Sequence, residues 1–213
     1  EGPYLAAIIA RLPEPTINLA AFGVAFAFAV IIEAPVIMLM SASTALVEDR
    51  QSFLALRRFS YGLGAALTAV QIIALTPTVF NFVSRDVLAL PPEVARLTHG
   101  GLALLLPWTS AIAYRRFRQG LLIRHHLTRR VAYGTVLRLL TMSVTAFVVY
   151  RFSPINISGA HLGALALSVG VIVEALASRL MTSSIVPLLM KRDRASDHRV
   201  DTPWHFSNLT RFY

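Results

Sequence analysis

The sequence predicts an all-α fold, a bundle of helices that crosses a lipid bilayer several times. Hydrophobic residues make up 55% of the chain and the mean hydropathy is +0.61, which leaves too little polar surface for a soluble globule. About 20 residues of helix cross the roughly 30 Å hydrocarbon core. The long apolar stretches reach or approach this length and are apolar on every face, unlike the alternating strands of a membrane barrel. The predicted spans cover residues 17–47, 60–84, 98–114, 131–150 and 154–189.

Cationic side chains are concentrated in alternate links between these spans, and this pattern predicts the topology. Because cytoplasmic links carry the excess of Lys and Arg, the basic links are expected in the cytoplasm and the N-terminal end outside. Topology then explains the net charge of +9, and nucleic acid is not an expected partner. We expect a multi-pass protein of the plasma (inner) membrane. The basic links contain Arg50, Arg57 and Arg58; Arg115, Arg116, Arg118, Arg124, Arg129 and Arg130; and Lys191, Arg192, Arg194 and Arg199.

The two ends of the chain predict a piece of a longer membrane protein. The apolar segment 4–10 is too short to cross a bilayer by itself. At the other end a polar stretch is followed by residues 209–213, which turn apolar again. We therefore expect a transmembrane lobe over residues 1–190 and a cytoplasmic linker over residues 191–213. This linker is expected to lead into a second lobe of the same polypeptide.

Polar residues deep inside the spans are the candidate substrate- or ion-binding residues, because a charge at the bilayer centre costs several kcal/mol. Glu33 lies near the middle of the first span, two residues before Pro35, which removes a backbone donor. A carboxylate beside such a break is typical of proton- or cation-coupling positions in carriers. Alternatively, Pro35 only kinks the helix. In the second span, Gln71 either lines a substrate path or donates a hydrogen bond between helices.

The fourth and fifth spans each contain a further candidate. Arg138 lies about two turns into the fourth span. It either packs there and reaches toward the interface, or faces a cavity and favours an anionic substrate. Glu174, near the middle of the fifth span, either takes part in transport or pairs with Arg138 or Arg179. Gly159 and Gly163 are predicted to let helices approach closely.

The sequence contains no motif of an enzyme. A phosphate-cradling glycine loop, a nucleophile elbow and a zinc-protease helix are all missing. The chain has no cysteine, which excludes disulfides and thiolate metal sites. His125 and His126 are adjacent, so a helix would point them in different directions and no metal site is expected there. We expect no enzyme activity, no metal site and no cofactor.

Several segments are similar, in the same order, to segments of one exporter superfamily. Residues 8–15 (IIARLPEP) and 19–25 (LAAFGVA) look like the junction of its first and second helices, and residues 41–47 like the small-residue end of the second. Residues 118–125 look like a short turn between the fourth and fifth helices, and residues 204–213 like the linker into the seventh. The chain thus resembles the multidrug/oligosaccharidyl-lipid/polysaccharide exporter superfamily. Within it, the similarity is to bacterial relatives of the multidrug and toxic compound extrusion (MATE) and progressive ankylosis proteins.

This resemblance implies a MATE-like N-terminal lobe, made of the end of helix 1 and helices 2–6. It also implies alternating access between two six-helix lobes, with the substrate bound in a central cavity. The leading hypothesis is a secondary transporter that exports a small organic or anionic solute, coupled to a proton or sodium gradient. A lipid-linked precursor flippase of the same fold is the first alternative and would be expected to have a more cationic cavity. A non-transporting membrane scaffold is the second, and ion pairs that seal the buried carboxylates would favour it.

Overall fold

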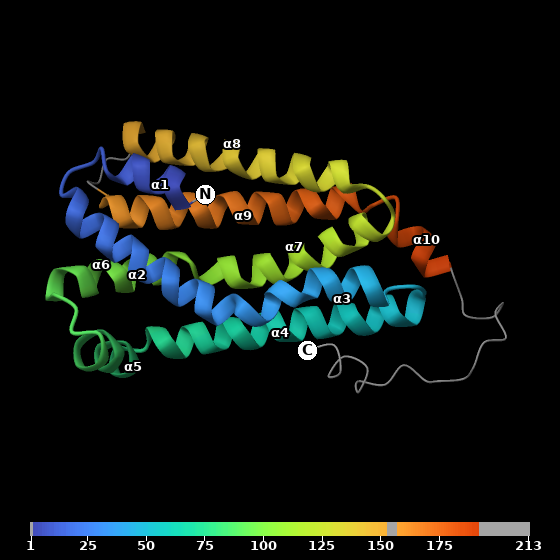
Figure 1. Cartoon of the computed structure of the whole chain (residues 1–213), viewed down its shortest axis with the longest axis horizontal. Coiled ribbons are helices and arrows are strands. Elements are labelled where there is room, and N and C mark those ends of the chain that lie inside the picture. The colour runs from blue at the N-terminus through green and yellow to red at the C-terminus, as the bar shows by residue number, and fades with distance from the viewer. Residues whose placement is uncertain (1, 153–156, 192–213) are drawn as a thin grey trace.

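The computed structural model describes residues 2–152 and 157–191, and within these ranges the chain forms helices and turns but no strand. The long helices run back and forth along one axis and form an elongated bundle (Figure 1). The predicted all-α fold is therefore confirmed. In chain order the elements are α1 (Gly2–Ile9), α2 (Pro15–Glu33), the 3₁₀ helix η1 (Ala34–Met38), α3 (Leu39–Leu46), α4 (Arg50–Leu75), α5 (Pro77–Asn81), the π-helix η2 (Phe82–Val87), α6 (Pro92–Leu104), α7 (Leu106–Arg124), α8 (Thr128–Phe152), α9 (Gly159–Met181) and α10 (Val186–Lys191).

Within the described residues, four helical segments are long and apolar enough to cross a bilayer. The first combines α2, η1 and α3, and the others are α4, α8 and α9. Their lengths of 23 to 32 residues exceed the about 20 residues that a crossing requires. The prediction of several apolar helices of membrane-spanning length is confirmed for these four. They span Pro15–Leu46, Arg50–Leu75, Thr128–Phe152 and Gly159–Met181.

The third predicted span has a different structure. Residues 98–114 do not form one helix, because α6 ends at Leu104 and α7 begins at Leu106. Pro107 lies in the first turn of α7, where its ring and its missing N–H interrupt a continuous helical hydrogen-bond ladder. α7 then continues as far as Arg124. The arginines that were predicted to lie in a link after residue 114 are therefore part of a helix.

The second predicted span is shifted toward the N-terminus by local backbone chemistry. α4 begins about three turns before residue 60, because the Asp49 side chain accepts a hydrogen bond from the Ser52 backbone N–H at 2.8 Å. Such a capping interaction satisfies donors at a helix start. α4 ends at Leu75, since the next residue is extended and precedes Pro77. The predicted range 60–84 therefore combines most of α4 with α5 and part of η2.

The fifth predicted span, residues 154–189, contains two helices. α9 begins after Ser158, whose hydroxyl accepts the backbone N–H of His161 at 3.3 Å. It ends at Met181, and the short α10 follows as a separate helix. Of the predicted cytoplasmic linker only Lys191 is described, as the last residue of α10. Residues 153–156 and the rest of the linker, residues 192–213, lie outside the described residues.

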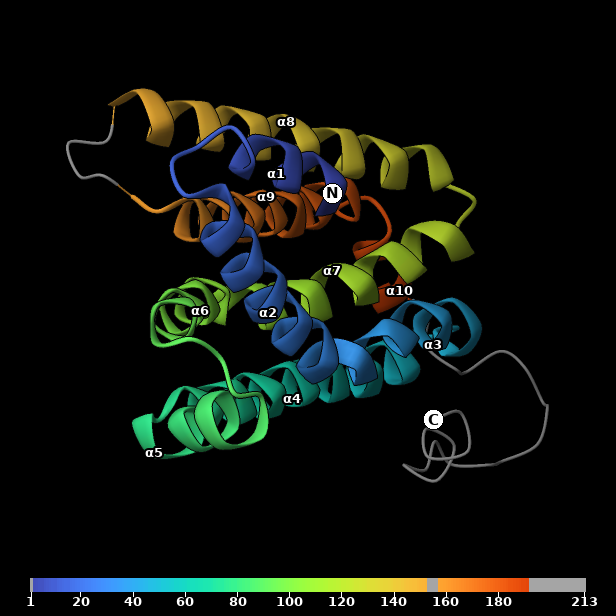
Figure 2. The same ribbon diagram turned by 60° about the vertical axis from the view of Figure 1, so that its left-hand side comes forward.

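α7 lies in the middle of the bundle although it carries four arginines. It packs against α3, α4 and α9, and both ribbon views place it between α4 and α9 (Figures 1 and 2). α8 lies at the edge, packs mainly on α9, and turns a stripe of large apolar side chains outward. The bundle thus buries charge at its centre and exposes apolar groups at its edge, as expected for helices surrounded by lipid. The stripe consists of Val136, Leu140, Val144 and Phe147.

Glycines allow close approaches between several helices. A Cβ atom added at Gly163 would lie 2.8 Å from Cδ1 of Ile9, and one added at Gly159 would lie 3.1 Å from Cγ2 of the same residue. The prediction that these two glycines allow close packing is confirmed, and the helices involved are α9 and α1. α7 meets α3 more closely still. A Cβ at Gly120 would lie 2.4 Å from the carbonyl oxygen of Met40.

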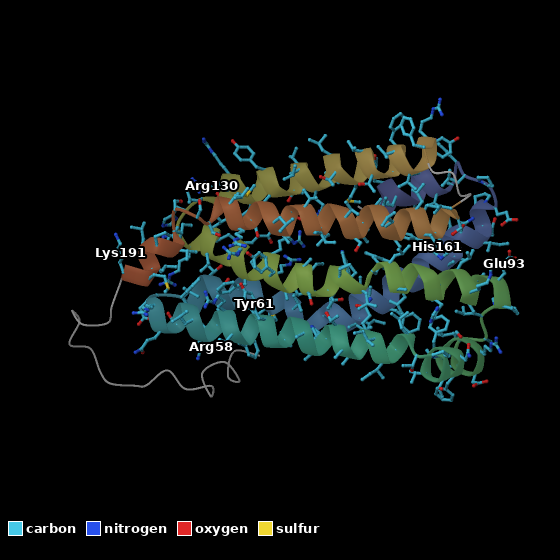
Figure 3. The ribbon with its side chains drawn as sticks, turned by 180° about the vertical axis from the view of Figure 1, so that it is seen from behind. Arg58, Tyr61, Glu93, Arg130, His161 and Lys191 are labelled. Carbon is cyan, nitrogen blue, oxygen red and sulfur yellow. The ribbon has the colours of Figure 1, made fainter. Side chains whose placement is uncertain are left out.

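The links that were predicted to be basic meet at one end of the bundle. Figure 3 places Arg130 and Lys191 at this end, and Glu93 and His161 at the other. Two of the cations have a local role as well. Arg124 and Arg130 donate hydrogen bonds to carbonyl oxygens at the C-terminal ends of α3 and α9, which have no partners within their own helices. The basic end is therefore stabilised by its arginines, whichever side of a membrane it faces.

Candidate functional site: an arginine-lined cavity

A partly open cavity of about 610 Å³ lies between α2, α7, α8 and α9. The first residues of α1 and α3 complete its wall. Most of the remaining wall is aromatic or aliphatic, so the polar groups converge on a space that is otherwise apolar. This combination is typical of ligand-binding sites. The polar side chains of the wall are Glu33, Arg115, Arg116, Gln119, Thr135 and Arg138.

α7 supplies the largest share of this wall. Trp108, Ile112, Arg115 and Gln119 follow one another at intervals of three or four residues, which places them on one face of the helix. Arg116 extends the face on one side. Arg115 is only 5% exposed. After the break, α7 presents a cationic face to the cavity. The preceding helix, α6, is buried mainly through apolar side chains.

Glu174 of α9 lies behind the cavity wall and contacts residues that line it. One of its carboxylate oxygens, Oε2, accepts hydrogen bonds from Nη1 of Arg115 at 2.6 Å and lies 3.3 Å from Nη1 of Arg138. The other, Oε1, accepts a hydrogen bond from Nε2 of Gln119 at 3.2 Å. Glu174 is 1% exposed and is not part of the cavity lining. The carboxylate therefore ties α7 and α8 to α9.

Room for the Glu174 carboxylate comes from a glycine on α8. A Cβ atom at Gly134 would lie 3.3 Å from Oε1 of Glu174 and 3.4 Å from its Cγ. Because Gly134 lacks this atom, the glutamate can lie directly against the α8 backbone. Arg138 is one helical turn further along the same face. The α8 sequence thus provides both the space for the carboxylate and one of its cationic partners.

The charges around the cavity do not balance. Among the described residues, three arginines and two glutamates belong to the cluster, which gives this part of the chain one net positive charge. Arg116 interacts electrostatically with all four of the other charged groups, Glu33, Arg115, Arg138 and Glu174. The described residues include no group of three His, Asp or Glu side chains that could hold a metal ion. A positive cavity favours an anion over a cation.

Several hydrogen-bond donors of the cavity wall have no acceptor among the described residues. These buried donors are Nε1 of Trp108, Nε of Arg115 and Nε of Arg116. The Arg116 Nη1 group contacts the thioether sulfur of Met40 at 3.8 Å, which is a weak acceptor. An unsatisfied buried donor costs about 1–3 kcal/mol, and water or a ligand with acceptor oxygens in the cavity would satisfy these three.

Glu33 lies where it was predicted to lie, beside a helix break, and its side chain lines the cavity. Pro35 has a different position. Its side chain is exposed rather than directed into the cavity, and it belongs to η1, between α2 and α3. The carbonyl of Ile31, which a residue with an N–H at position 35 could bond in a helix, instead accepts the N–H of Ala34. Pro35 therefore bends the helix without leaving that carbonyl available for a ligand.

Gln71 is buried outside the cavity lining. Its Nε2 donates to the carbonyl oxygen of Leu102 at 3.2 Å, and its Oε1 accepts a hydrogen bond from Thr109 at 2.8 Å. These partners lie on either side of the break between α6 and α7. The structure thus shows that Gln71 donates a hydrogen bond between helices, which was the alternative to its lining a substrate path.

The structure brings together three of the predicted site residues, Glu33, Arg138 and Glu174, and adds residues that the sequence analysis assigned to a link. Of the two pairings considered for Glu174, the one with Arg138 is present. Arg115 and Arg116 were missed because charges after an apolar stretch are usually taken to mark its end. The helical spacing from Trp108 onward continues through both arginines and is the signal that could have identified them.

Comparison with known proteins gives no family assignment. No protein-family model matches the chain, and no curated protein and no solved structure shows significant similarity to it.

Proposed function

We propose that the chain is one lobe of a multi-pass membrane carrier that transports an anionic solute. The observation that carries this proposal is the cluster of Arg115, Arg116 and Arg138 around a cavity inside a bundle of apolar helices. Buried cations are costly in such surroundings and are usually functional. The cluster has a net positive charge and unsatisfied donors, so a carboxylate or phosphate group is the best-matched ligand.

The wall residues divide into two roles in this proposal. The arginines and Trp108 contact the anion. Glu33 contributes the carboxylate of the wall, and it is the group that would bind a proton or sodium ion if a gradient drives transport. The MATE-like arrangement provides the movement, with a second lobe closing over the cavity and alternating access to the two sides of the plasma membrane. The basic end of the bundle faces the cytoplasm.

A lipid-linked precursor flippase of the same fold is the second candidate. The observation that favours it is that the cavity contains three arginines, whereas the sequence alone pointed to Arg138. A pyrophosphate headgroup carries several acceptor oxygens and would match these guanidinium groups. The scaffold hypothesis gains less support, because its ion pairs account for Glu174 and not for the unsatisfied donors on α7.

Flux through proteoliposomes tests the proposal. The full-length protein would be reconstituted and supplied with citrate, inorganic pyrophosphate, an organic cation or a polyprenyl pyrophosphate lipid, with and without proton and sodium gradients. We expect flux of one of the soluble anions and at least a tenfold decrease in that flux for Arg116→Gln. Arg116 is suited to this test because no carboxylate lies within hydrogen-bond distance of it in the described structure.

The control variant is Arg58→Gln, an exposed arginine of α4 (Figure 3), which should leave flux unchanged. Flux confined to the lipid substrate would favour the flippase. Transport of the cation alone, or of none of these substrates, would contradict the proposal.

A further inference from the structure

We infer that Glu174 is the internal counter-anion of this site, and that it lowers the affinity of the arginines for the substrate anion so that the bound anion can leave. This inference rests on the proposed anion carrier. It assigns to Glu174 a role in setting affinity, distinct from the ion-coupling role proposed for Glu33. The ligand class is a small oxyanion with carboxylate or phosphate groups.

The position of Glu174 behind the cavity wall is the first argument. Glu174 does not line the cavity, whereas both arginines that contact it do. An anion in the cavity and the Glu174 carboxylate therefore approach Arg115 and Arg138 from different sides. Neither has to displace the other before both can act on the same guanidinium groups.

The donor pattern of Arg115 is the second argument. Its Nη1 group binds Glu174 at 2.6 Å, while its Nε is buried and has no acceptor in the part of the chain that the structure describes. A guanidinium has five N–H donors in a rigid fork. Holding one side of the fork orients the rest of the group, so the glutamate positions Arg115 as well as neutralising part of its charge.

Electrostatics decides the direction of the effect. A negative charge within a few ångströms of two cations lowers the potential that a third group experiences in the cavity, and this weakens the binding of anions. A transport site needs such a limit, because a ligand that binds too tightly cannot leave. Without Glu174 the cluster would contain three arginines and one glutamate, and a bound anion would be held more firmly.

The test compares binding with turnover for Glu174→Gln. Glutamine keeps the size of the side chain and an acceptor oxygen but removes the charge. We expect this variant of the full-length protein, purified in detergent, to bind citrate or inorganic pyrophosphate about tenfold or more tightly in calorimetry. In proteoliposomes its maximal flux should fall, because release becomes slow. A purely structural role would weaken binding and flux together.

Two further comparisons control for charge and for folding. Glu93→Gln removes the same charge at the far end of the bundle (Figure 3) and should leave affinity unchanged. Arg138→Gln should weaken binding, and adding Glu174→Gln to it should restore much of the lost affinity, because the pair is removed together. This rescue provides a test even if Glu174→Gln alone does not fold.

The outcomes separate the two proposals. If the unmodified protein binds the anions but Glu174→Gln binds them equally or less tightly, or the double variant shows no rescue, the counter-anion role is wrong and the carrier proposal stands. If neither the unmodified protein nor the variants bind an anion, the proposed function itself is contradicted.

Discussion

Some buried polar side chains of this molecule each form hydrogen bonds or ion pairs with several partners. Glu174 has three partners on two other helices, and Gln71 bridges the two sides of the α6–α7 break. Removing one member of such a group leaves its partners buried without hydrogen bonds, which costs more than the bond itself contributes. We therefore expect single substitutions at these positions to lower stability mainly because the remaining partners are left without hydrogen bonds.

Gln71→Leu should destabilise the folded protein by about 1–3 kcal/mol, because the hydroxyl of Thr109 and the carbonyl of Leu102 lose their buried partner. Thermal unfolding of the purified protein in detergent would measure this change. Transport per folded molecule should be unaffected, since Gln71 lies outside the cavity lining. Ile72→Leu, at the neighbouring exposed position, is the matched control. A loss of flux in Gln71→Leu with unchanged stability would show instead that Gln71 belongs to the substrate path.

The site could be predicted in part from single residues. Depth in an apolar stretch was enough to select Glu33, Arg138 and Glu174 as candidates, because placing a charge in such a stretch costs free energy. The cationic side of the site could not be found in this way. Arg115 and Arg116 follow an apolar stretch directly, and only the folded structure shows that they belong to α7 rather than to a link, with Arg115 buried and Arg116 partly buried.

At the scale of helices, the contact between α3 and α7 depends on one glycine. Ser43 donates to the carbonyl oxygen of Phe117 at 2.9 Å, and Thr44 donates to that of Gly120 at 3.2 Å. These bonds require the two backbones to be close. Small residues allow such contacts between helices that have no hydrophobic force to hold them together in lipid.

Gly120→Val should force α3 and α7 apart, because even the first added carbon would lie 2.4 Å from the Met40 carbonyl oxygen. We expect a loss of at least about 1–3 kcal/mol of stability and a lower yield of monodisperse protein in size-exclusion chromatography. Gly23→Val provides the control, since a Cβ at Gly23 has no atom within 4 Å. Equal effects of the two substitutions would mean that helix propensity, rather than this contact, determines the result.

The existence of most long helices could be predicted from the lengths of the apolar stretches. The residues at which these helices begin and end could not be predicted in this way. The capping of α4 by Asp49 and the breaks at Pro35, Pro77 and Pro107 all move a boundary by local hydrogen bonding or ring geometry. Hydropathy averages over about 19 residues and does not resolve such events. Residues 98–114 show the largest difference, because a proline divides the stretch and the arginines after it continue the second helix.

At the scale of the whole molecule, the two ends of the bundle differ in charge. The ends of α7 and α9 and the start of α8 carry arginines at one end of the bundle, and Glu93 lies at the other (Figure 3). If the bundle spans the plasma membrane, this asymmetry places the basic end in the cytoplasm. The proposal of a membrane carrier therefore includes a definite orientation that can be measured.

Single cysteines can measure this orientation, because the chain has none of its own. Arg129→Cys should react with a thiol reagent that cannot cross the membrane only after cells are opened, and Glu93→Cys should react in intact cells. Both positions are exposed. Ser168→Cys, at a buried position of α9, is the control that should react in neither case. The opposite pattern of labelling would reverse the proposed orientation.

The ion pair between α7 and α9 also has a consequence for the order of events during synthesis. An arginine at the centre of a membrane helix costs about 2.5–3.5 kcal/mol on insertion, and α7 carries its arginines without an acidic residue of its own. Its carboxylate partner, Glu174, is 59 residues further along the chain. The ribosome therefore releases α7 before Glu174, the carboxylate partner of its arginine, has been synthesised. If the bundle spans a membrane, we expect α6 and α7 to remain at the translocon or the membrane surface until α9 emerges, and to enter the bilayer together with it.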